Sequence, residues 1–317
     1  MAAVDPVDAL IMDEAGPAGR TLAIDAPALP ADRYRADRAE TPGAGLLTRA
    51  DLVSIDTVLL RLPRALSALD ELAERIAAWG EPGVRVVAGG RVKHMTHGMN
   101  EVLARHFGEV RASRGRQKAR VLHASDPHRP AALSWPRSRR DDDLDLTVVA
   151  HGATFGTNRL DAGTRLLAGA LELAPGERRP AVDLGCGSGI LAALLARRGY
   201  TVTGLDVSAA ACASTAATAA ANRLAVRVLH ADAADGLRVG QAAVIVCNPP
   251  FHVGAAKDSS PAFAMFDAAG AGLAPGGEFW CVFNSHLPYL PALRRAIGPT
   301  GIVARDRAYT VTRSVRA

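Results

Sequence analysis

The sequence predicts an α/β protein built from two domains in tandem. In its second half, short apolar runs alternate with alanine- or leucine-rich stretches, which is typical of a mainly parallel sheet with helices on both faces. A similar succession of segments recurs in the first half. The length of 317 residues also exceeds the ~100–200 residues of one ordinary domain, so each half can bury its own core.

The expected strands of the second half are its short apolar runs. These are Leu146–Val149, Ala181–Leu184, Val202–Leu205, Val226–Leu229, Val244–Cys247 and Phe279–Phe283. The expected helices between them are Ile190–Arg198, Ala209–Arg223 and Phe263–Leu273. Because such sheets bind ligands at the carboxyl ends of their strands, polar residues that follow these runs are candidate site residues.

The stretch from Pro127 to Asp145 interrupts the pattern. It contains three prolines and a charge run that changes from Arg137–Arg140 to Asp141–Asp143, which marks a linker or a surface crossover. We therefore expect a first domain over residues 1–140 and a second over residues 141–317.

The two halves contain matching segments. Val58–Pro63 resembles Val244–Pro249, and each is followed by a helix-like stretch, a Pro-Gly turn and an apolar strand. We interpret this match as the duplication of one α/β unit, although any two α/β units share part of such a pattern. Leu62 stands in the first copy where Asn248 stands in the second.

The first copy is expected to lack a ligand site. No glycine-rich turn follows an early strand there, and its expected first strands are Leu10–Met12 and Leu22–Ile24. The connection between those runs is too short for a crossover helix. We therefore expect a degenerate domain that serves as a scaffold or as a recognition surface.

Composition excludes several protein classes. Apolar residues make up 49% of the chain and charged residues 22%, so neither half is expected to be disordered. No apolar run approaches the ~20 residues of a membrane span, and no signal-type segment opens the chain. The four cysteines have no metal-ligand spacing, so we expect reduced thiols, no metal and a cytoplasmic location.

The charge of the chain is unevenly distributed. Residues 1–84 hold 8 basic and 14 acidic side chains, whereas residues 85–140 hold 13 basic and 3 acidic ones. A basic block of this kind is typical of a nucleic-acid surface, although a solvated arginine-rich face remains an equal alternative from charge alone. The candidate nucleic-acid-binding residues in this block are Arg114, Arg116, Lys118 and Arg120.

A glycine-rich loop follows the run Ala181–Leu184. Gly185, Gly187 and Gly189 allow the backbone to turn tightly and approach a ligand, and the loop leads into a helix N-terminus that favours anions. The spacing differs from the dinucleotide pattern because Ile190 occupies the place of its last glycine. Asp183 immediately precedes the loop.

Two further acids follow neighbouring strands. Asp206 can accept both ribose hydroxyls of an adenosine ligand, and Asp232 can accept from an adenine amine. The alternative for Asp206 is a helix N-cap or a turn residue, and the alternative for Asp232 is an ordinary loop residue. Together with Asp183 and the glycine loop, these acids fit S-adenosyl-L-methionine as cofactor.

The segment from Asn248 to His252 reads Asn-Pro-Pro-Phe-His. Two prolines end the preceding strand and begin a rigid loop at the expected cofactor edge. The Asn248 side-chain oxygen and the Pro249 carbonyl can accept the hydrogens of a planar amine, which orients its nitrogen toward a methyl group. Phe251 can stack on the ring of an extruded base, and His252 can contact the base, contact a phosphate or simply pack.

The motifs resemble those of class I S-adenosylmethionine-dependent methyltransferases, and most closely the ribosomal RNA guanine-N2 methyltransferases. The resemblance rests on Phe155–Gly156, Leu160–Thr164, Val182–Gly189, Asn248–His252, Asn284 and Leu287–Tyr289. Gly90–His94 and Gln117–Arg120 look more like the large-subunit branch than the small-subunit branch. The resemblance implies two tandem Rossmann-like methyltransferase domains, of which only the second binds cofactor and the degenerate N-terminal one helps to hold RNA.

The resemblance implies transfer of a methyl group to the N2 amine of a guanine in ribosomal RNA, free or within a ribosomal subunit. A protein-glutamine methyltransferase and a DNA amino-methyltransferase share the Asn-Pro-Pro-aromatic motif and remain alternatives. A non-catalytic RNA-binding assembly factor is a third. The internal duplication already supplies two lobes, so we expect a monomer.

Overall fold

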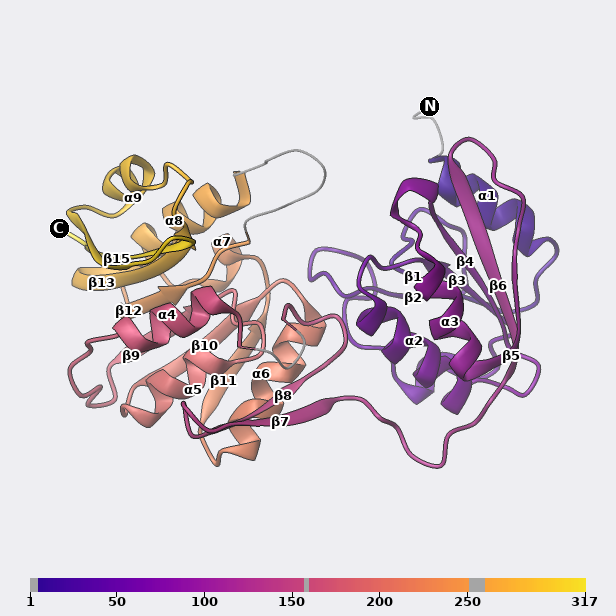
Figure 1. The fold of residues 1–317 in the computed structure, drawn as a ribbon, viewed down its shortest axis with the longest axis horizontal. Helices are drawn as coiled ribbons and strands as arrows, with labels where there is room; N and C mark the ends of the chain where they lie inside the picture. The colour runs from indigo at the N-terminus through magenta and orange to yellow at the C-terminus, as the bar shows by residue number, and fades with distance from the viewer. Residues whose placement is uncertain (1–4, 157–159, 251–259) are drawn as a thin grey trace. The chain divides into compact units, whose positions relative to one another are not determined.

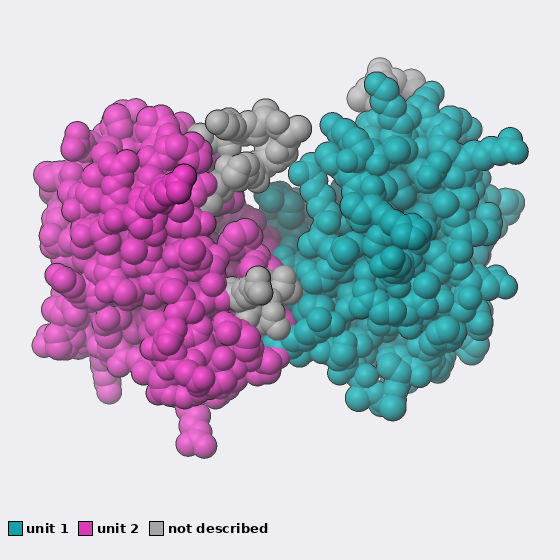
Figure 2. All heavy atoms as spheres, in the orientation of Figure 1, with its two compact units in different colours: residues 1–137, 151–153 teal, residues 138–150, 154–317 magenta. Residues whose placement is uncertain are grey.

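A computed structural model describes residues 5–156, 160–250 and 260–317 (Figure 1). The chain divides into two compact units (Figure 2). Unit 1 comprises residues 1–137 and 151–153, and unit 2 comprises residues 138–150 and 154–317. The division lies within the stretch expected to be a linker, but the short segment His151–Ala153 returns to unit 1.

Unit 1 contains a six-stranded mixed sheet. Its strands follow the order β2-β1-β3-β4-β6-β5, in which β6 is antiparallel to β4 and β5 and the other neighbours are parallel. The elements of this unit are α1 (Pro6–Ala15), β1 (Thr21–Ile24), β2 (Arg33–Arg35), η1 (Arg49–Leu52), β3 (Thr57–Arg61), α2 (Leu66–Trp79), β4 (Arg85–Arg91), η2 (Val92–His94), α3 (His97–His106), β5 (Phe107–Ala112) and β6 (Ala119–Pro127).

Unit 2 contains a seven-stranded mixed sheet in the order β11-β10-β9-β12-β13-β15-β14. The first five strands are parallel, and β15 is antiparallel to β13 and β14. Its elements are α4 (Ala162–Ala170), β9 (Pro180–Leu184), α5 (Ile190–Arg197), β10 (Thr201–Asp206), α6 (Ala209–Ala221), β11 (Val226–His230), α7 (Ala233–Gly236), β12 (Ala242–Cys247), α8 (Ser260–Gly272), β13 (Leu273–Asn284), α9 (Leu290–Ala296), β14 (Thr300–Arg305) and β15 (Tyr309–Val315).

Each sheet buries apolar side chains on both faces. In unit 2, residues of α4 and α5 pack on one face of the sheet, and residues of α8 and α9 pack on the other. In unit 1, α1 covers one face, whereas α2 and α3 cover the opposite face. The expected α/β class is therefore confirmed. Because helices cover both faces of each sheet, the central strands consist of nearly uninterrupted apolar residues.

The two sheets share one topology. Strands β3, β4, β5 and β6 occupy the places of β12, β13, β14 and β15 in the order of their sheet, including the antiparallel pairs. Helix α1 contacts β4 and β6 as α4 contacts β13 and β15. Among the described residues of unit 1, no strand corresponds to β11 and no helix separates β1 from β2. This match supports the duplication inferred from the sequence.

One expected strand is wrong, and another forms outside the main sheet. Leu10–Met12 lies within α1, because Asp5 caps that helix and Pro6 opens it, so the first strand of the unit is β1. Leu146–Val149 does form a strand, β8 (Leu146–Ala150), but β8 pairs with β7 (Arg137–Asp141) in a separate two-stranded sheet. Local pattern revealed the strand but not its partner.

None of the helices in the described part of the chain combines the length and the apolar character that a membrane crossing requires. The four cysteines are free and buried within unit 2.

Candidate active site

The glycine loop joins the carboxyl end of β9 to the start of α5. Gly185, Gly187 and Gly189 all have positive φ angles, of 76°, 53° and 78°. A Cβ at Gly189 would lie 2.7 Å from the Cα of Thr215, so that position requires glycine for close packing as well as for its conformation. At Gly187 a Cβ would meet no described heavy atom within 4 Å, so the loop presents an open backbone there.

Asp206 ends β10, the strand beside β9, and is tied to the glycine loop. Its Oδ2 accepts a hydrogen bond from the Gly187 N–H at 3.0 Å, and its Oδ1 accepts from the Ser208 N–H at 2.9 Å. Ser208 itself caps α6. The alternative turn role predicted for Asp206 is thus present, and the same carboxylate also faces the loop expected to hold a cofactor.

Asp183 lies inside the unit, with an exposed fraction of 1%. Its Oδ2 accepts a hydrogen bond from the Ala192 N–H at 2.8 Å, which fixes α5 against β9. Burial is the main cause that raises the pKa of Asp183 to about 8; the Ala192 hydrogen bond opposes this shift, and the nearby Asp206 charge adds to it. Asp183 therefore stabilises the junction between β9, the glycine loop and α5. A direct contact between Asp183 and the cofactor stays a prediction.

Asp232 follows β11, the next strand outward from β10. It is exposed and immediately precedes α7. Because β11 pairs in parallel with β10, with His230 opposite Asp206, Asp232 lies on the same edge of the sheet as the glycine loop. The three acids thus lie at or next to the carboxyl ends of three neighbouring strands, β9, β10 and β11.

Asn248 and Pro249 follow β12, which lies on the other side of β9. Cys247 is opposite Leu184 in the register of these strands, so Asn248 begins beside the glycine loop. Pro249 is buried and Asn248 is half-buried. Phe251 and His252, for which we predict stacking and substrate contacts, lie outside the described residues.

Asn248 reaches two residues that the motif analysis did not assign to the site. Its Nδ2 donates to Oγ1 of Thr164 at 2.9 Å and to Oδ2 of Asp161 at 3.3 Å. Both residues belong to the start of α4, more than 80 positions earlier in the chain. The available signal was the helix-start pattern of Asp161, which predicts a cap but not a contact with Asn248.

Aromatic side chains pack behind this edge of the sheet. The ring of Tyr289 lies 5.5 Å from Phe263, 5.3 Å from Phe266 and 5.3 Å from Phe283 between centroids, and Phe266 also contacts Phe279. Tyr289 is only 2% exposed. In a chain with only 4% aromatic residues, this concentration supports the ends of β13 and α8 next to the Asn-Pro-Pro segment.

The candidate RNA-binding cations gather on one hairpin of unit 1. Arg114, Arg116 and Lys118 lie in the turn between β5 and β6, and Arg120 lies at the start of β6. All four are exposed, and Arg116 forms an ion pair with Asp13. These four residues therefore lie close together at the end of one β-hairpin, and we call Arg114, Arg116, Lys118 and Arg120 the basic hairpin.

Other arginines of the basic block are used inside unit 1. Arg91 lies 3.0 Å from an oxygen of Asp5, and Arg105 and Arg137 lie 3.3 Å and 3.0 Å from the Asp70 carboxylate. Burial raises the pKa of Asp70, but hydrogen bonds from His106 and Trp135 and the charge of Arg105 hold it below its usual range. The charge count therefore overstates the positive surface that remains for a polyanion.

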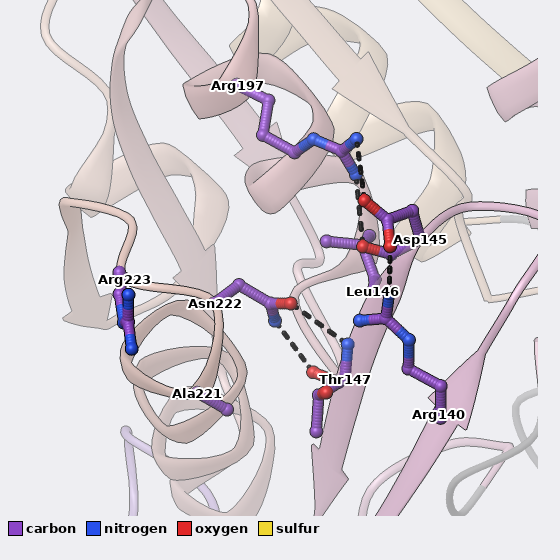
Figure 3. A pocket seen from close by; sticks show the side chains of 8 residues that line it. All are labelled: Arg140, Asp145, Leu146, Thr147, Arg197, Ala221, Asn222 and Arg223. Carbon is purple, nitrogen blue, oxygen red and sulfur yellow. Dashed lines mark hydrogen bonds and ion pairs between the residues drawn. The ribbon is translucent and has the colours of Figure 1, made fainter.

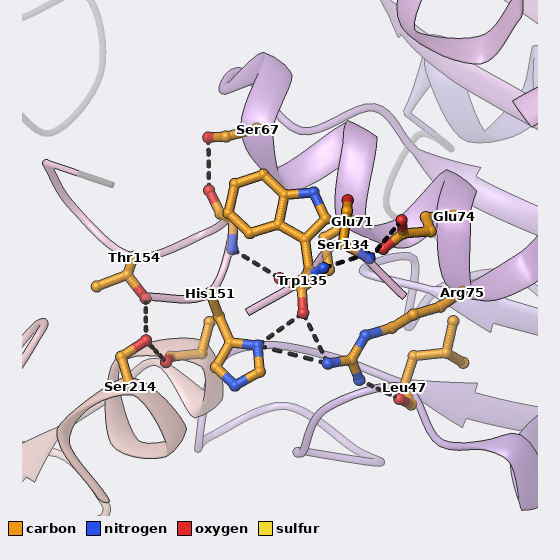
Figure 4. A network of polar contacts seen from close by, with 12 residues as sticks. Leu47, Ser67, Glu71, Glu74, Arg75, Ser134, Trp135, His151, Thr154 and Ser214 are labelled. Carbon is orange, nitrogen blue, oxygen red and sulfur yellow. Dashed lines mark hydrogen bonds and ion pairs between the residues drawn. The ribbon is translucent and has the colours of Figure 1, made fainter. Parts of the chain in front are cut away.

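A second acid of α2 holds the short segment that returns to unit 1 (Figure 4). Glu71 lies 2.7 Å from Arg75 and 2.6 Å from Nδ1 of His151, and its Oε2 accepts from the Gly152 N–H at 2.6 Å. Burial raises the pKa of Glu71, but the His151 hydrogen bond and charge, the Arg75 charge and the Gly152 N–H hold it below its usual range. Within unit 2, Thr154 and Ser214 are joined by a 2.7 Å hydrogen bond.

A hollow of about 400 Å³ opens on unit 2 (Figure 3). Its polar lining includes Arg140, Asp145, Arg197, Asn222 and Arg223. Helices α5 and α6 start at the carboxyl edge of the sheet and end in this lining, so the hollow lies at the amino edge. Since ligands of such sheets bind at the carboxyl edge, the hollow is not the cofactor site.

Comparison with known proteins agrees with the division of the chain into two α/β units. The Methyltransferase small domain family matches residues 145–313, and the RLMG N-terminal domain family matches residues 37–128. A T. thermophilus 16S rRNA N2 methyltransferase, solved in complex with AdoMet and guanosine, superposes with a TM-score of 0.81 at 24% identity, covering 99% of this chain and 92% of that one. That likeness establishes the shared two-domain fold.

Curated relatives cover most of the chain. The chain is 37% identical over 274 residues to the ribosomal RNA large subunit methyltransferase G of Streptomyces coelicolor, covering 83% of this chain and 72% of that protein. It is 34% identical to the protein of that name from Streptomyces griseus, covering 98% of this chain and 88% of the relative.

The fold and the glycine loop together define a class I S-adenosylmethionine-dependent methyltransferase with two tandem Rossmann-like domains. The open backbone at Gly187 and the acids at adjacent strand ends fit S-adenosyl-L-methionine. Within this class, the chain belongs to the ribosomal RNA large subunit methyltransferase G family. The resemblance found in the sequence and its lean toward the large-subunit branch are confirmed.

Proposed function

We propose that this protein transfers a methyl group from S-adenosyl-L-methionine to the exocyclic N2 amine of a guanine in large-subunit ribosomal RNA. Family membership supports the substrate class, and one structural observation supports the chemistry. Asn248 follows β12 directly beside the glycine loop, and its Oδ1 is buried with no hydrogen-bond donor among the described residues. A planar amine brings the hydrogens that such an acceptor lacks.

The cofactor supplies an electrophilic methyl group when bound. The residues of this chain orient the nucleophile, since the exocyclic amine of guanine is conjugated to its ring and attacks poorly. Oδ1 of Asn248 and the carbonyl of Pro249 accept its two hydrogens, direct the nitrogen lone pair and stabilise the positive charge that develops on nitrogen. No strong base is required, because the alkylated nitrogen is acidic and loses its proton readily.

We propose a division of labour along the chain. Gly185, Gly187 and Gly189 hold the methionine part of the cofactor, with Asp183 beneath them, while Asp206 accepts the ribose hydroxyls and Asp232 the adenine amine. The basic hairpin of unit 1 binds RNA phosphates. Phe251 and His252 are assigned to the flipped guanine on the sequence motif alone.

The test uses ribosomal RNA isolated from a strain that lacks the gene, since that RNA retains an unmodified target. The wild-type protein is expected to form N2-methylguanosine in it, detected by mass spectrometry of the nucleosides. Asn248→Ala is expected to lose about 100-fold or more in kcat, as for removal of one preorganised polar group. Asn100→Ala, in α3 of unit 1, is the matched control. Wild-type turnover in Asn248→Ala, or methylation of protein alone, would contradict the proposal.

We further infer a monomer that works in the cytoplasm, where its ribosomal substrate is found. The internal duplication supports this, because one chain already provides two α/β units. Light scattering on the purified protein is expected to give 33.0 kDa. Twice that mass would contradict the inference.

A further inference from the structure

The carboxylate of Asp161 is held in place by the helix it caps. Its Oδ1 accepts hydrogen bonds from the N–H groups of Gly163 at 2.9 Å and Thr164 at 3.2 Å. The Thr164 hydroxyl donates its proton to Oδ2 of the same carboxylate. These three donors fix both side chains, so the start of α4 presents a rigid pair of acceptors.

This pair of acceptors determines which way the Asn248 amide points. Nδ2 of Asn248 lies 2.9 Å from Thr164 Oγ1, and 3.3 Å and 3.5 Å from the two oxygens of Asp161. A carboxylate only accepts, and the Thr164 proton is already donated to it, so only an N–H group can face this pair. If the amide turned over, its oxygen would meet acceptors alone and three hydrogen bonds would be lost.

The opposite end of the amide is therefore left as an acceptor. Oδ1 of Asn248 is buried and has no donor among the described residues. An unpaired buried acceptor costs about 1–3 kcal/mol, so a group that donates a hydrogen to Oδ1 is stabilised there. We infer that Asp161 and Thr164 are positioning residues, which hold Asn248 with Oδ1 ready to accept a hydrogen from the substrate amine. This inference rests on the proposed role of Asn248.

The first unit shows that a helix cap alone does not make this arrangement. Asp5 caps α1 as Asp161 caps α4, and the two helices pack on matching strands. Asp5 pairs instead with Arg61 at 3.1 Å and Arg91 at 3.0 Å, and Leu62 follows β3. The acceptor pair of Asp161 and Thr164 occurs in the unit that contains Asn248. Helix capping alone therefore does not account for this pair, and its contact with Asn248 indicates a role in the reaction.

The experiment compares two substitutions that leave the helix cap intact. Thr164→Val keeps the shape of the side chain but removes the 2.9 Å acceptor, and Thr164→Ser is its matched control. Asp161→Asn remains a good cap, since Asn and Asp cap helices about equally well. To accept from Gly163 and Thr164, however, the new amide must turn its NH2 toward Asn248, whose own NH2 it would repel.

Methyl transfer to the unmodified ribosomal RNA is measured together with cofactor affinity by calorimetry and thermal stability. Thr164→Val and Asp161→Asn are each expected to lower kcat by roughly 10- to 100-fold, with KM for RNA and Kd for cofactor within about 2-fold of wild type. Thr164→Ser should stay within about 3-fold in kcat, because its hydroxyl restores the acceptor. A cap that served stability alone would lower Tm and leave kcat unchanged.

The Asn248→Ala background separates this inference from the proposed function. There, Thr164→Val should cause no further loss of kcat, because the amide that it orients is gone. An equal further loss in that background would overturn the positioning role. So would full kcat in Thr164→Val and Asp161→Asn alongside an inactive Asn248→Ala, and the proposed function would then stand alone. Full activity of Asn248→Ala would overturn both.

Discussion

The N–H of Gly187 donates a 3.0 Å hydrogen bond to Oδ2 of Asp206, so the acid at the end of β10 and the glycine loop after β9 form one rigid corner. The same carboxylate accepts from Ser208 with its other oxygen. A change at Asp206 therefore acts on the shape of the loop and on the acceptors available to a ribose.

Asp206→Asn is expected to weaken cofactor binding. An amide can offer only one oxygen to the two N–H donors, and it removes the charge that strengthens both bonds. Since hydrogen bonds to a charged group contribute about 1.5–3 kcal/mol, Kd for S-adenosyl-L-methionine should rise about 10-fold or more by calorimetry. Asp267→Asn, at an exposed position of α8, should leave Kd unchanged. An unaltered Kd in Asp206→Asn would refute the ribose assignment.

Asp183→Asn is expected to change how stability depends on pH. The pKa of Asp183 is raised from 3.8 to about 8 by burial. Between these values the folded protein keeps a proton that the unfolded chain releases, so the contribution of Asp183 to wild-type stability falls as pH rises through this window, by up to ~1.4 kcal/mol per pH unit. The amide has no such proton. Urea unfolding from pH 5 to 9 should therefore show a flatter profile for Asp183→Asn, whereas a profile parallel to wild type would contradict the assignment.

Charge reversal on the basic hairpin is expected to weaken RNA binding without affecting the cofactor. Replacing Arg114, Lys118 and Arg120 by Glu removes three phosphate contacts, so the salt dependence of log K should flatten by about 2–3 in slope. Filter binding at several salt concentrations measures this slope, and calorimetry should give an unchanged cofactor Kd.

The matched control for that variant reverses Arg38, Arg49 and Arg64, which are exposed arginines of the same unit outside the hairpin. Net charge changes equally in both triple variants. Equal loss of RNA affinity would show that binding follows net charge rather than the basic hairpin.

Tyr289→Ala is expected to destabilise unit 2 strongly. The ring contacts three phenylalanines and is 2% exposed, so its removal leaves a cavity that the surrounding rings cannot fill. By analogy with other large aromatic truncations, the free energy of unfolding should fall by about 3–5 kcal/mol in urea titration. Tyr289→Phe retains the ring and should unfold close to wild type. A loss below 1 kcal/mol for the alanine variant would mean that the cluster repacks.

Local patterns predicted the glycine loop and the central strands because these depend on neighbouring residues. The apolar run Val244–Cys247 followed by two prolines, for example, predicted both β12 and its end. Leu10–Met12 was misassigned because three apolar residues suit either a strand or a helix. Asp5 and Pro6 form a helix-start signal, and the structure shows that these three residues belong to the helix that this signal opens.

Contacts between distant segments could not be predicted in this way. Asn248 meets Thr164 across 84 positions, and no periodicity encodes that approach. Arg137–Asp141 forms β7 although its residues show no apolar alternation, because β8 supplies its partner. Charge counts likewise do not reveal that Arg105 and Arg137 bind Asp70, since the acid lies on α2, more than 30 positions earlier.

The return of His151–Ala153 to unit 1 makes the two domains interleaved rather than simply consecutive. A fragment ending at Arg137 would lose His151 and Gly152 and leave the buried Glu71 with Arg75 alone of these three partners. Removing two hydrogen-bond partners of a buried carboxylate is expected to destabilise that fragment. No single cut releases both units whole, because a cut after Arg137 leaves residues 151–153 attached to unit 2 and a cut after Ala153 leaves residues 138–150 attached to unit 1.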